Sequence, residues 1–301
     1  MKTISFLNNK GGVGKTASMI TIAHMISEMG KRVLMIDVDP QGNSSSMYSD
    51  IDVITLLENR LRKIPEVNIP SVGDLFINRN ADIHKCIQHT EYDGLDIIPS
   101  LLTLSEIEEQ LKADITTPQQ FRLKMHLSKI KDEYDYCLID CSPSINILNI
   151  NALAASDCVY APIQCEAWSA IGMTSVMNLV EVVQNYNPNL KYEGFFFTQW
   201  NRSENVNIAV YNLLAQYVYN DMIPITICRS NMIKEMSFTQ TPIKVVDKNA
   251  RKKITRDYLR LTEYILSDNK DQLKERYKDE LDASINDLLL KRQNRSKKSE
   301  K

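Results

Sequence analysis

The sequence has no pair of cysteines at the CxxC spacing and no histidines at the spacing of a zinc site. Cys137, Cys158 and Cys165 lie in or beside apolar runs, where a small buried thiol is the ordinary role. Without a disulfide or zinc framework, we expect a reduced, cytoplasmic setting. The remaining cysteines are Cys86, Cys141 and Cys228.

Long hydrophobic runs and an excess of one charge are also missing. No stretch of about 18 apolar residues occurs, so we expect no membrane-spanning helix. The first strand candidate begins at the N-terminus, and we expect no signal peptide before it. The formal net charge of the 301 residues is only −2. Any affinity for nucleic acid must therefore come from local basic patches.

The most informative feature that is present is the glycine-rich run at residues 9–16, Asn-Lys-Gly-Gly-Val-Gly-Lys-Thr. An ordinary P-loop has Gly, four free positions and then Gly-Lys-Ser/Thr, and here Asn9 replaces the first Gly. Backbone N–H groups with little side-chain bulk still suit a phosphate chain. Lys15 would neutralise phosphate charge, and the Thr16 hydroxyl would ligate Mg²⁺. Lys10 is an extra lysine that nucleotide binding alone does not require.

Apolar segments around this run predict an α/β fold. Residues 3–7 form a buried strand candidate and residues 15–29 an amphipathic helix, so strand, glycine loop and helix come in the order that a P-loop requires. Strands alternating with helices predict a P-loop NTPase fold with a mostly parallel, twisted sheet and helices on both faces. We expect peripheral helices and loops over residues 50–92. The further strand candidates are residues 32–36, 94–99, 134–139, 157–163, 193–198 and 223–227.

Three aspartates follow strand candidates and complete the predicted site. Asp140 ends a strand and can hold a Mg²⁺-bound water or the Thr16 hydroxyl. Asp37 and Asp39 are two apart and share a face of the extended chain. Asp39 lies further out and is our candidate for orienting the attacking water, although Asp before Pro is also a common turn former. The predicted metal-site residues are Thr16, Asp37 and Asp140, and the predicted catalytic residues are Lys10, Lys15, Asp39 and Asp140.

A basic stretch lies near the C-terminus. Seven basic and two acidic residues occur between Lys244 and Arg260. Within the expected helix 248–266, i, i+4 spacing would place one basic residue per turn on a single stripe. Such a stripe suits binding to a phosphate backbone independent of sequence, and a solvated helix face is the alternative. The stripe residues are Lys248, Lys252, Arg256 and Arg260, with Arg251 beside them.

The last thirty residues contain two further features. Residues 270–290 predict a charged helix, and residues 291–301 are almost entirely polar, so we expect a disordered basic tail. That tail either adds weak contact with DNA or only aids solubility. Leu281, Ile285 and Leu288 are helically spaced before Lys291, a pattern that can lie on anionic lipid, whereas packing on the domain is the simpler explanation.

Together these motifs resemble those of the deviant Walker-A ATPases, and among them the ParA-type partition ATPases. The resemblance rests on Lys10–Thr16, on Asp-Val-Asp-Pro-Gln-Gly-Asn at 37–43 and on the run from Tyr134 to Ser144. Segments 94–99, 151–157 and 162–166 are similar as well. The likeness covers roughly residues 1–265. It implies an ATPase domain over residues 1–268, followed by a C-terminal helix at 269–290 and the tail.

The resemblance also implies a mechanism. ATP and Mg²⁺ would hold a homodimer together, with Lys10 of each protomer reaching the phosphates of the other. The dimer would bind double-stranded DNA non-specifically and associate with the nucleoid. A ParB-type centromere-binding protein would stimulate slow hydrolysis. The implied nucleotide contacts are Lys10, Gly11, Gly12, Val13, Gly14, Lys15, Thr16, Ala17, Asn201 and Arg229, and Arg202 joins the basic residues named above as a DNA contact.

The sequence departs from the family pattern at two places. Ser142 stands where a first proline is usual, and Cys228 stands where Ile-Pro-Arg is usual before Arg229. Two other groups of related ATPases offer alternatives to the partition function. A MinD-like ATPase would cycle on and off a membrane through its C-terminal helix. An electron-donating ATPase of the nitrogenase iron-protein type would need cysteines that bridge a dimer through an iron–sulfur cluster, and no cysteine here lies in a matching motif.

Overall fold

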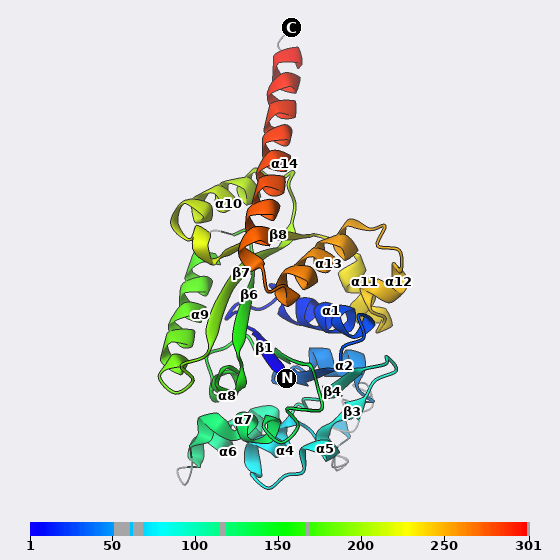
Figure 1. The fold of residues 1–301 in the computed structure, drawn as a ribbon, viewed down its shortest axis with the longest axis vertical. Helices are drawn as coiled ribbons and strands as arrows, with labels where there is room; N and C mark the ends of the chain where they lie inside the picture. Colours follow the sequence, from blue (N-terminus) through cyan, green and yellow to red (C-terminus); the bar gives the residue numbers. More distant parts are fainter. Residues whose placement is uncertain (51–60, 63–68, 115–117, 167–168, 300–301) are drawn as a thin grey trace.

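A computed structural model describes residues 1–50, 61–62, 69–114, 118–166 and 169–299, with the backbone alone for 169–171 and 292–299. Its centre is one eight-stranded sheet (Figure 1). The strands are β1 (Lys2–Phe6), β2 (Val33–Asp37), β3 (Gln88–His89), β4 (Leu95–Ile98), β5 (Tyr136–Asp140), β6 (Cys158–Gln164), β7 (Lys191–Trp200) and β8 (Met222–Cys228).

The sheet has the order β3-β4-β2-β5-β1-β6-β7-β8, and all its pairings are parallel except that of β3 with β4. The predicted α/β fold with a mostly parallel sheet is therefore confirmed, and the seven strands that we expected are all present. The two-residue edge strand β3 falls in the segment 50–92, where we expected only helices and loops. The expectation for residues 51–60 and 63–68 lies outside the described residues.

Helices cover both faces of this sheet, as Figure 1 shows. The α-helices are α1 (Lys15–Glu28), α2 (Asn43–Tyr48), α4 (Val72–Ile77), α5 (Ile83–Cys86), α6 (Leu104–Ala113), α7 (Arg122–Leu127), α8 (Ile147–Ala155), α9 (Ser169–Gln184), α10 (Asn205–Tyr217), α11 (Met232–Thr239), α12 (Ile243–Val246), α13 (Lys253–Leu266) and α14 (Lys270–Ser299).

Alternation along the strands divides the core into two halves. On β2, Val33 and Met35 pack on the side of α1 and α13, whereas Leu34 and Ile36 pack on the side of α8 and α9. All four side chains are fully buried. Strands that are buried on both faces are typical of a parallel sheet whose crossover helices lie above and below it.

The order of the strands determines where a site can form. β1 lies between β5 and β6. Strands β2 to β5 lie on one side of β1 in the sheet and β6 to β8 lie on the other, so the strand order reverses direction at β1. In open α/β sheets, the crevice at such a point, beyond the carboxyl ends of the strands, is the usual ligand site. The register pairs Asp140 with Phe6 of β1 and with Asp37 of β2, so these three strand ends lie side by side.

Helix α14 is fixed to the body at its start and packs along it. Lys270 donates from Nζ to the Tyr160 hydroxyl at 2.8 Å and forms an ion pair with Glu193. Further along, Ile285 is buried, and Leu281 and Leu288 pack against the core on the side of α8 and α9. This packing accounts for the apolar residues that a membrane-associated helix would also show. Within the described residues, no helix has both the length and the apolar character needed to cross a bilayer.

The structure differs from our expectation for the C-terminal tail. Helix α14 continues through Ser299, although we expected residues 291–301 to be disordered. No Gly or Pro occurs after residue 269, and Lys291 pairs with Asp287 one turn earlier at 2.6 Å. Such i, i+4 pairs and good helix formers favour continuation of the helix. Figure 1 shows its last turns extending beyond α10.

A buried histidine on α1 makes the stability of the fold depend on pH. His24 is 2% exposed, and its ring packs edge-on against Tyr92 with 4.8 Å between centroids. Burial, assisted by nearby Lys244, lowers the pKa of His24 to about 4. The unfolded chain takes up a proton near pH 6.5, which the folded chain resists. Stability contributed by neutral His24 is therefore lost as the pH falls from about 6.5 towards 4.

We therefore expect the free energy of unfolding of His24→Leu to depend less on pH between 6.5 and 4 than that of the parent protein. The free energy of unfolding of the parent protein should fall by up to about 3 kcal/mol more than that of the variant between pH 6.5 and 4. Denaturant unfolding at a series of pH values measures this difference. His89→Gln is the control, because the His89 side chain is 86% exposed. Equal pH dependence in the parent and in His24→Leu would contradict the assignment.

Candidate functional site

The glycine-rich run forms a tight loop between β1 and α1. Gly12 has φ 74° and Gly14 has φ 84°, both in the left-handed region that glycine adopts without steric cost. A Cβ at Gly11 or Gly12 would meet no atom within 4 Å, so these positions leave open space in front of the backbone. The loop lines a cleft of ≈ 530 Å³ together with Asp39 and residues of α11.

Side chains from behind the loop hold its carbonyl groups. The Gly12 carbonyl accepts from Gln164 Nε2 at 2.8 Å and from Gln199 Nε2 at 2.9 Å. The Val13 carbonyl accepts from Thr198 Oγ1 at 2.7 Å. In a trans peptide the C=O and the following N–H point in opposite directions. The N–H groups of Val13 and Gly14 are therefore fixed facing away from β6 and β7, as donors to an anion.

Lys15 is the buried cation of the loop. It is 6% exposed, and its Nζ donates to the Lys10 carbonyl at 3.1 Å. Burial lowers the pKa of Lys15, and the nearby carboxylate of Asp140 counteracts part of this shift. A buried ammonium with one backbone partner retains donors for a phosphate. Its position agrees with the predicted role of Lys15 in neutralising phosphate charge, which remains a prediction.

Asp37 and Asp140 end adjacent strands, but their carboxylates differ in their hydrogen bonds. Asp37 accepts from the Ser45 N–H at 2.9 Å, from the Ser45 hydroxyl at 2.7 Å and from the Asp39 N–H at 3.0 Å. Asp140 is fully buried, and neither of its carboxylate oxygens has a hydrogen-bond partner. Burial first, and the neighbouring Asp37 second, raise the pKa of Asp140 well above its usual range. Asp37 thus fixes a loop, whereas Asp140 has no hydrogen bond and the nearby charge of Lys15 offsets only part of its burial.

The uncompensated carboxylate fits a hydrated divalent cation. Mg²⁺ keeps several of its waters and is held by one or two carboxylates together with phosphate oxygens. Thr16 lines the cleft and is close enough to Asp140 for its hydroxyl to lower the pKa of that carboxyl. Thr16 and Asp140 are therefore the residues that would hold Mg²⁺. The oxygens of Asp37 already accept three hydrogen bonds, so its predicted part in the outer coordination of the metal has less support.

Asp39 lies further out, as its position in the sequence predicts. It is 6% exposed, lines the same cleft and accepts from the Gln41 N–H at 2.9 Å. Burial raises the pKa of Asp39, and the charge of Lys15 partly opposes this. Asp39 both precedes the turn at Pro40 and lines the cleft. Its interpretation as a turn former therefore does not exclude its interpretation as the residue that orients water.

Lys10, the extra lysine, lies at the surface. Its ammonium forms an ion pair with Glu166, just beyond the end of β6, and the two side chains are 40% and 47% exposed. The Lys10 N–H donates to Asn8 Oδ1 at 2.9 Å, which fixes the backbone at the entrance of the loop. Lys10 thus presents its charge outward, whereas Lys15 presents its charge inward.

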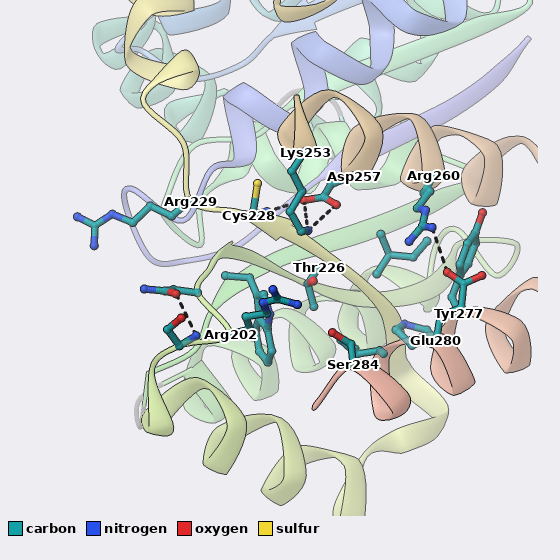
Figure 2. Close-up of a pocket in the computed structure, with 16 residues that line it drawn as sticks. Arg202, Thr226, Cys228, Arg229, Lys253, Asp257, Arg260, Tyr277, Glu280 and Ser284 are labelled. Carbon is teal, nitrogen blue, oxygen red and sulfur yellow. Dashed lines mark hydrogen bonds and ion pairs between the residues drawn. The ribbon is translucent and has the colours of Figure 1, made fainter. Parts of the chain in front are cut away.

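A second cleft of ≈ 750 Å³ lies between the ends of β7 and β8, α13 and α14 (Figure 2). Asn201, Arg202 and Arg229 belong to its lining. The resemblance implies that Asn201 and Arg229 contact the nucleotide, but they do not line the cleft of the glycine loop. Figure 2 shows the Arg229 side chain extending away from the other residues that line the second cleft. Arg260 also lines this cleft and pairs with Glu280 of α14 at 3.1 Å.

The basic residues between 248 and 260 do not form the helical stripe that the sequence predicts. Helix α13 begins only at Lys253, with Lys252 at its N-cap. Asp247 prevents an earlier start of the helix, because its carboxylate accepts hydrogen bonds from the backbone N–H groups of residues 251 and 252 at 3.0 and 2.8 Å. Lys248 and Arg251 consequently lie in the turn before the helix. The exposed basic residues of this region are Lys248, Arg251, Lys252, Lys253, Arg256 and Arg260.

The clamp residues Gln164, Thr198 and Gln199 were missed from the sequence. All three lie at the carboxyl ends of β6 and β7, and only that position could have drawn attention to them. The cysteines lie elsewhere. Five of them are buried and Cys228 is half-buried. In the part of the chain that the structure describes, no group of three His, Cys, Asp or Glu side chains could hold a metal ion without other ligands.

Comparison with known proteins gives concordant results. A family model described as an AAA domain matches residues 1–192. The sporulation initiation inhibitor protein Soj of Bacillus subtilis is 33% identical over 252 residues, which cover 83% of this chain and 93% of Soj. The chromosome partitioning protein ParA of Caulobacter vibrioides is 31% identical over 279 residues, which cover 90% of this chain and 96% of that protein.

Solved structures agree with this comparison. A plasmid partition protein of Borrelia burgdorferi bound to AMPPNP superposes with a TM-score of 0.67 at 25% identity, covering 86% of this chain and 95% of that chain. Cobyrinic acid a,c-diamide synthase of Mycobacterium smegmatis, with a bound ATP analogue and magnesium, has a TM-score of 0.65 at 25% identity, covering 84% and 98%. Proteins of this fold therefore include nucleotide- and magnesium-bound examples.

The contrast between the two buried aspartates predicts opposite effects of the same substitution. Asp140→Asn removes an uncompensated buried charge, so the melting temperature of the ligand-free protein should rise by roughly 2–5 °C at pH 8. Because the folded pKa is raised, the gain should shrink as the pH falls and vanish near the unfolded pKa of about 4. Asp37→Asn should lower the melting temperature, because it disturbs three hydrogen bonds. Thermal unfolding at several pH values measures both effects, and equal destabilisation by the two variants would contradict this interpretation.

Proposed function

Because this chain belongs to the family of Soj- and ParA-type partitioning ATPases, we propose that it is an ATP-dependent DNA partition protein that acts as a nucleotide-gated dimer. The observation that carries the proposal is the division of the two loop lysines. Lys15 is buried beside the carboxylates of its own cleft, whereas Lys10 points outward to an exposed ion pair. One lysine thus serves the nucleotide of its own chain, and the other is available to a second chain.

Within one protomer, the geometry supports the following roles. The N–H groups of the loop and the Lys15 ammonium bind the phosphates of ATP. Thr16 and Asp140 hold Mg²⁺, which neutralises charge on the phosphates when it is bound. Asp39 orients the attacking water from the outer part of the cleft. Val13 and Gly14 are already oriented by the clamp residues, so little reorganisation is required on binding.

Between protomers, Lys10 completes the site of the partner. Its ion pair with Glu166 is solvent-exposed, and such pairs contribute only about 0–1 kcal/mol. A charge-assisted hydrogen bond to a phosphate is stronger, so Lys10 can leave Glu166 and bind the phosphates in the partner protomer instead. Dimer formation would then depend on the phosphate chain of ATP, which makes the nucleotide a switch.

The DNA-binding surface of the dimer is formed by exposed basic residues that bind the phosphate backbone without sequence preference. The net charge of −2 makes the overall field weak, so the local cluster determines the binding. A ParB-type partner stimulates hydrolysis and thereby releases the dimer from the nucleoid. The proposed DNA contacts are Arg202, Lys248, Arg251, Lys252, Arg256 and Arg260.

The first test is retention on DNA of arbitrary sequence. We expect the protein to be retained on duplex DNA with ATP but not with ADP, and the affinity to fall roughly 10³-fold between about 50 and 200 mM salt if about six phosphates are contacted. Electrophoretic or surface-based binding measures both. Arg251→Ala with Lys252→Ala should weaken retention, whereas the control Lys124→Ala with Lys129→Ala should not. Binding that is equal with ATP and ADP would refute the switch.

The second test concerns dimerisation. Lys10→Ala should weaken ATP-dependent dimerisation about 10-fold or more, because the charge-assisted contact to the partner's phosphates is lost. Nucleotide binding by the protomer should remain, since Lys15 is unchanged. Analytical ultracentrifugation with and without ATP measures the dimer, and the exposed Lys31→Ala serves as the control. An intact ATP-dependent dimer in Lys10→Ala would disprove the exchange between protomers.

A further inference from the structure

We propose that Gln199 is a positioning residue that couples the glycine loop to the second cleft, so that phosphate bound at the loop changes the placement of Arg202. The inference rests on the proposed function, because it concerns how the nucleotide reaches the DNA-binding surface. Gln199 lines the cleft of the glycine loop, and the next residue, Trp200, lines the second cleft. The two clefts therefore meet at one peptide bond.

The backbone of Gln199 is held in a disfavoured conformation. Its φ is 51°, and in the described residues only Gln240 and Ala250 share a positive φ without being glycine. Gln199 lies at the end of β7, where the register with β8 shifts between Phe197 and Trp200. A side chain makes the left-handed region unfavourable, so the conformation persists only where neighbouring contacts maintain it.

One such contact is with the glycine loop. Gln199 Nε2 donates to the Gly12 carbonyl at 2.9 Å, across 187 residues of sequence. The same peptide carries the Val13 N–H, which faces the opposite way and is a donor to phosphate. When an anion accepts from this N–H, the peptide is polarised and its carbonyl becomes a stronger acceptor. The bond that holds Gln199 is therefore stronger when phosphate is bound at the loop.

On the other side, Gln199 is joined to the loop that carries Arg202. The Trp200 carbonyl accepts from the Arg229 N–H at 3.1 Å, and the Asn201 carbonyl accepts from Asn207 Nδ2 at 3.0 Å. The Trp200 ring packs against Phe197 and Tyr211, with centroids 5.7 and 6.1 Å away. A change in φ at Gln199 reorients the peptide of Trp200 directly and thereby displaces Arg202.

These contacts define two states of one residue. In one state, the one seen in this structure, the bond to Gly12 keeps Gln199 left-handed and Arg202 in the place drawn in Figure 2, and phosphate at the loop favours this state by strengthening the bond. Without phosphate, the weaker bond allows the backbone to relax, and the loop at residues 200–203 shifts relative to Arg229. A two-state element whose equilibrium is biased from both sites is the physical requirement for coupling.

Trp200 provides a direct readout that does not depend on DNA. The sequence contains only one other tryptophan, so Trp168→Phe leaves Trp200 as the sole reporter. In this background, ATP with Mg²⁺ should change the emission of Trp200. Gln199→Met keeps the length of the side chain but removes the amide donor, and should reduce the change at least about 2-fold. Nucleotide affinity should fall by no more than roughly 5-fold, as expected for one neutral hydrogen bond.

Two further variants separate the bond from the strain. Gln199→Gly adopts a positive φ without cost and also lacks the amide, so it should uncouple Trp200 from the nucleotide as Gln199→Met does. Gln240→Met is the matched control. Gln240 has φ 53°, and its Nε2 donates to the Ser46 carbonyl at 2.6 Å rather than to Gly12. The control should keep the full response of Trp200.

DNA retention then distinguishes the two levels of the proposal. The ratio of DNA affinity with ATP to that with ADP should fall in Gln199→Met and stay unchanged in Gln240→Met. If the parent shows no ATP-dependent retention but its Trp200 response needs Gln199, the proposed function fails and the coupling of the clefts stands. If Trp200 does not respond to nucleotide in the parent, or responds as fully in Gln199→Met and Gln199→Gly as in the parent, the coupling is overturned.

Discussion

The burial of Asp140 beside Asp37 is the constraint on which the rest of the site depends. Parallel register places the two carboxylates at the ends of adjacent strands, in the interior of the molecule. Three hydrogen bonds offset part of the burial of Asp37, whereas Asp140 has no hydrogen bond and only the nearby charge of Lys15 partly opposes its burial. An uncompensated buried charge destabilises the ligand-free state. If the proposed function holds, magnesium and nucleotide that bind at this carboxylate would offset this destabilisation.

The glycine loop also depends on groups that neighbouring side chains hold in place. Its glycines allow the backbone to turn, but freedom to turn does not orient N–H groups. The orientation comes from Gln164, Thr198 and Gln199, which hold two successive carbonyls from behind. Donors that are oriented before the ligand arrives require little reorganisation during reaction. The proposed cradle for phosphate is therefore formed jointly by the loop and by two strands that follow it by about 150 residues or more.

Much of this could be predicted from the sequence. The strand, glycine loop and helix were placed correctly because local apolar periodicity and glycine spacing determine them. The helical stripe was wrong because one side chain, that of Asp247, caps the backbone and delays α13 to Lys253. The polar composition of residues 291–301 wrongly predicted a disordered tail, because good helix formers and ion pairs one turn apart extend α14. The conformation of Gln199 had no local signal, since its partner lies 187 residues away.

The distribution of charge between interior and surface connects these observations. Lys15 and Asp140, the charges proposed to serve the chain's own nucleotide, are buried, where the low dielectric strengthens their interactions. The Lys10 ammonium and the basic residues before and within α13 lie at the surface, where water and salt screen them. Interior charges give affinity that persists at high ionic strength, whereas surface charges give contacts that form and break readily. The proposed function, in which the nucleotide is held firmly while larger partners are released, requires this division of charge.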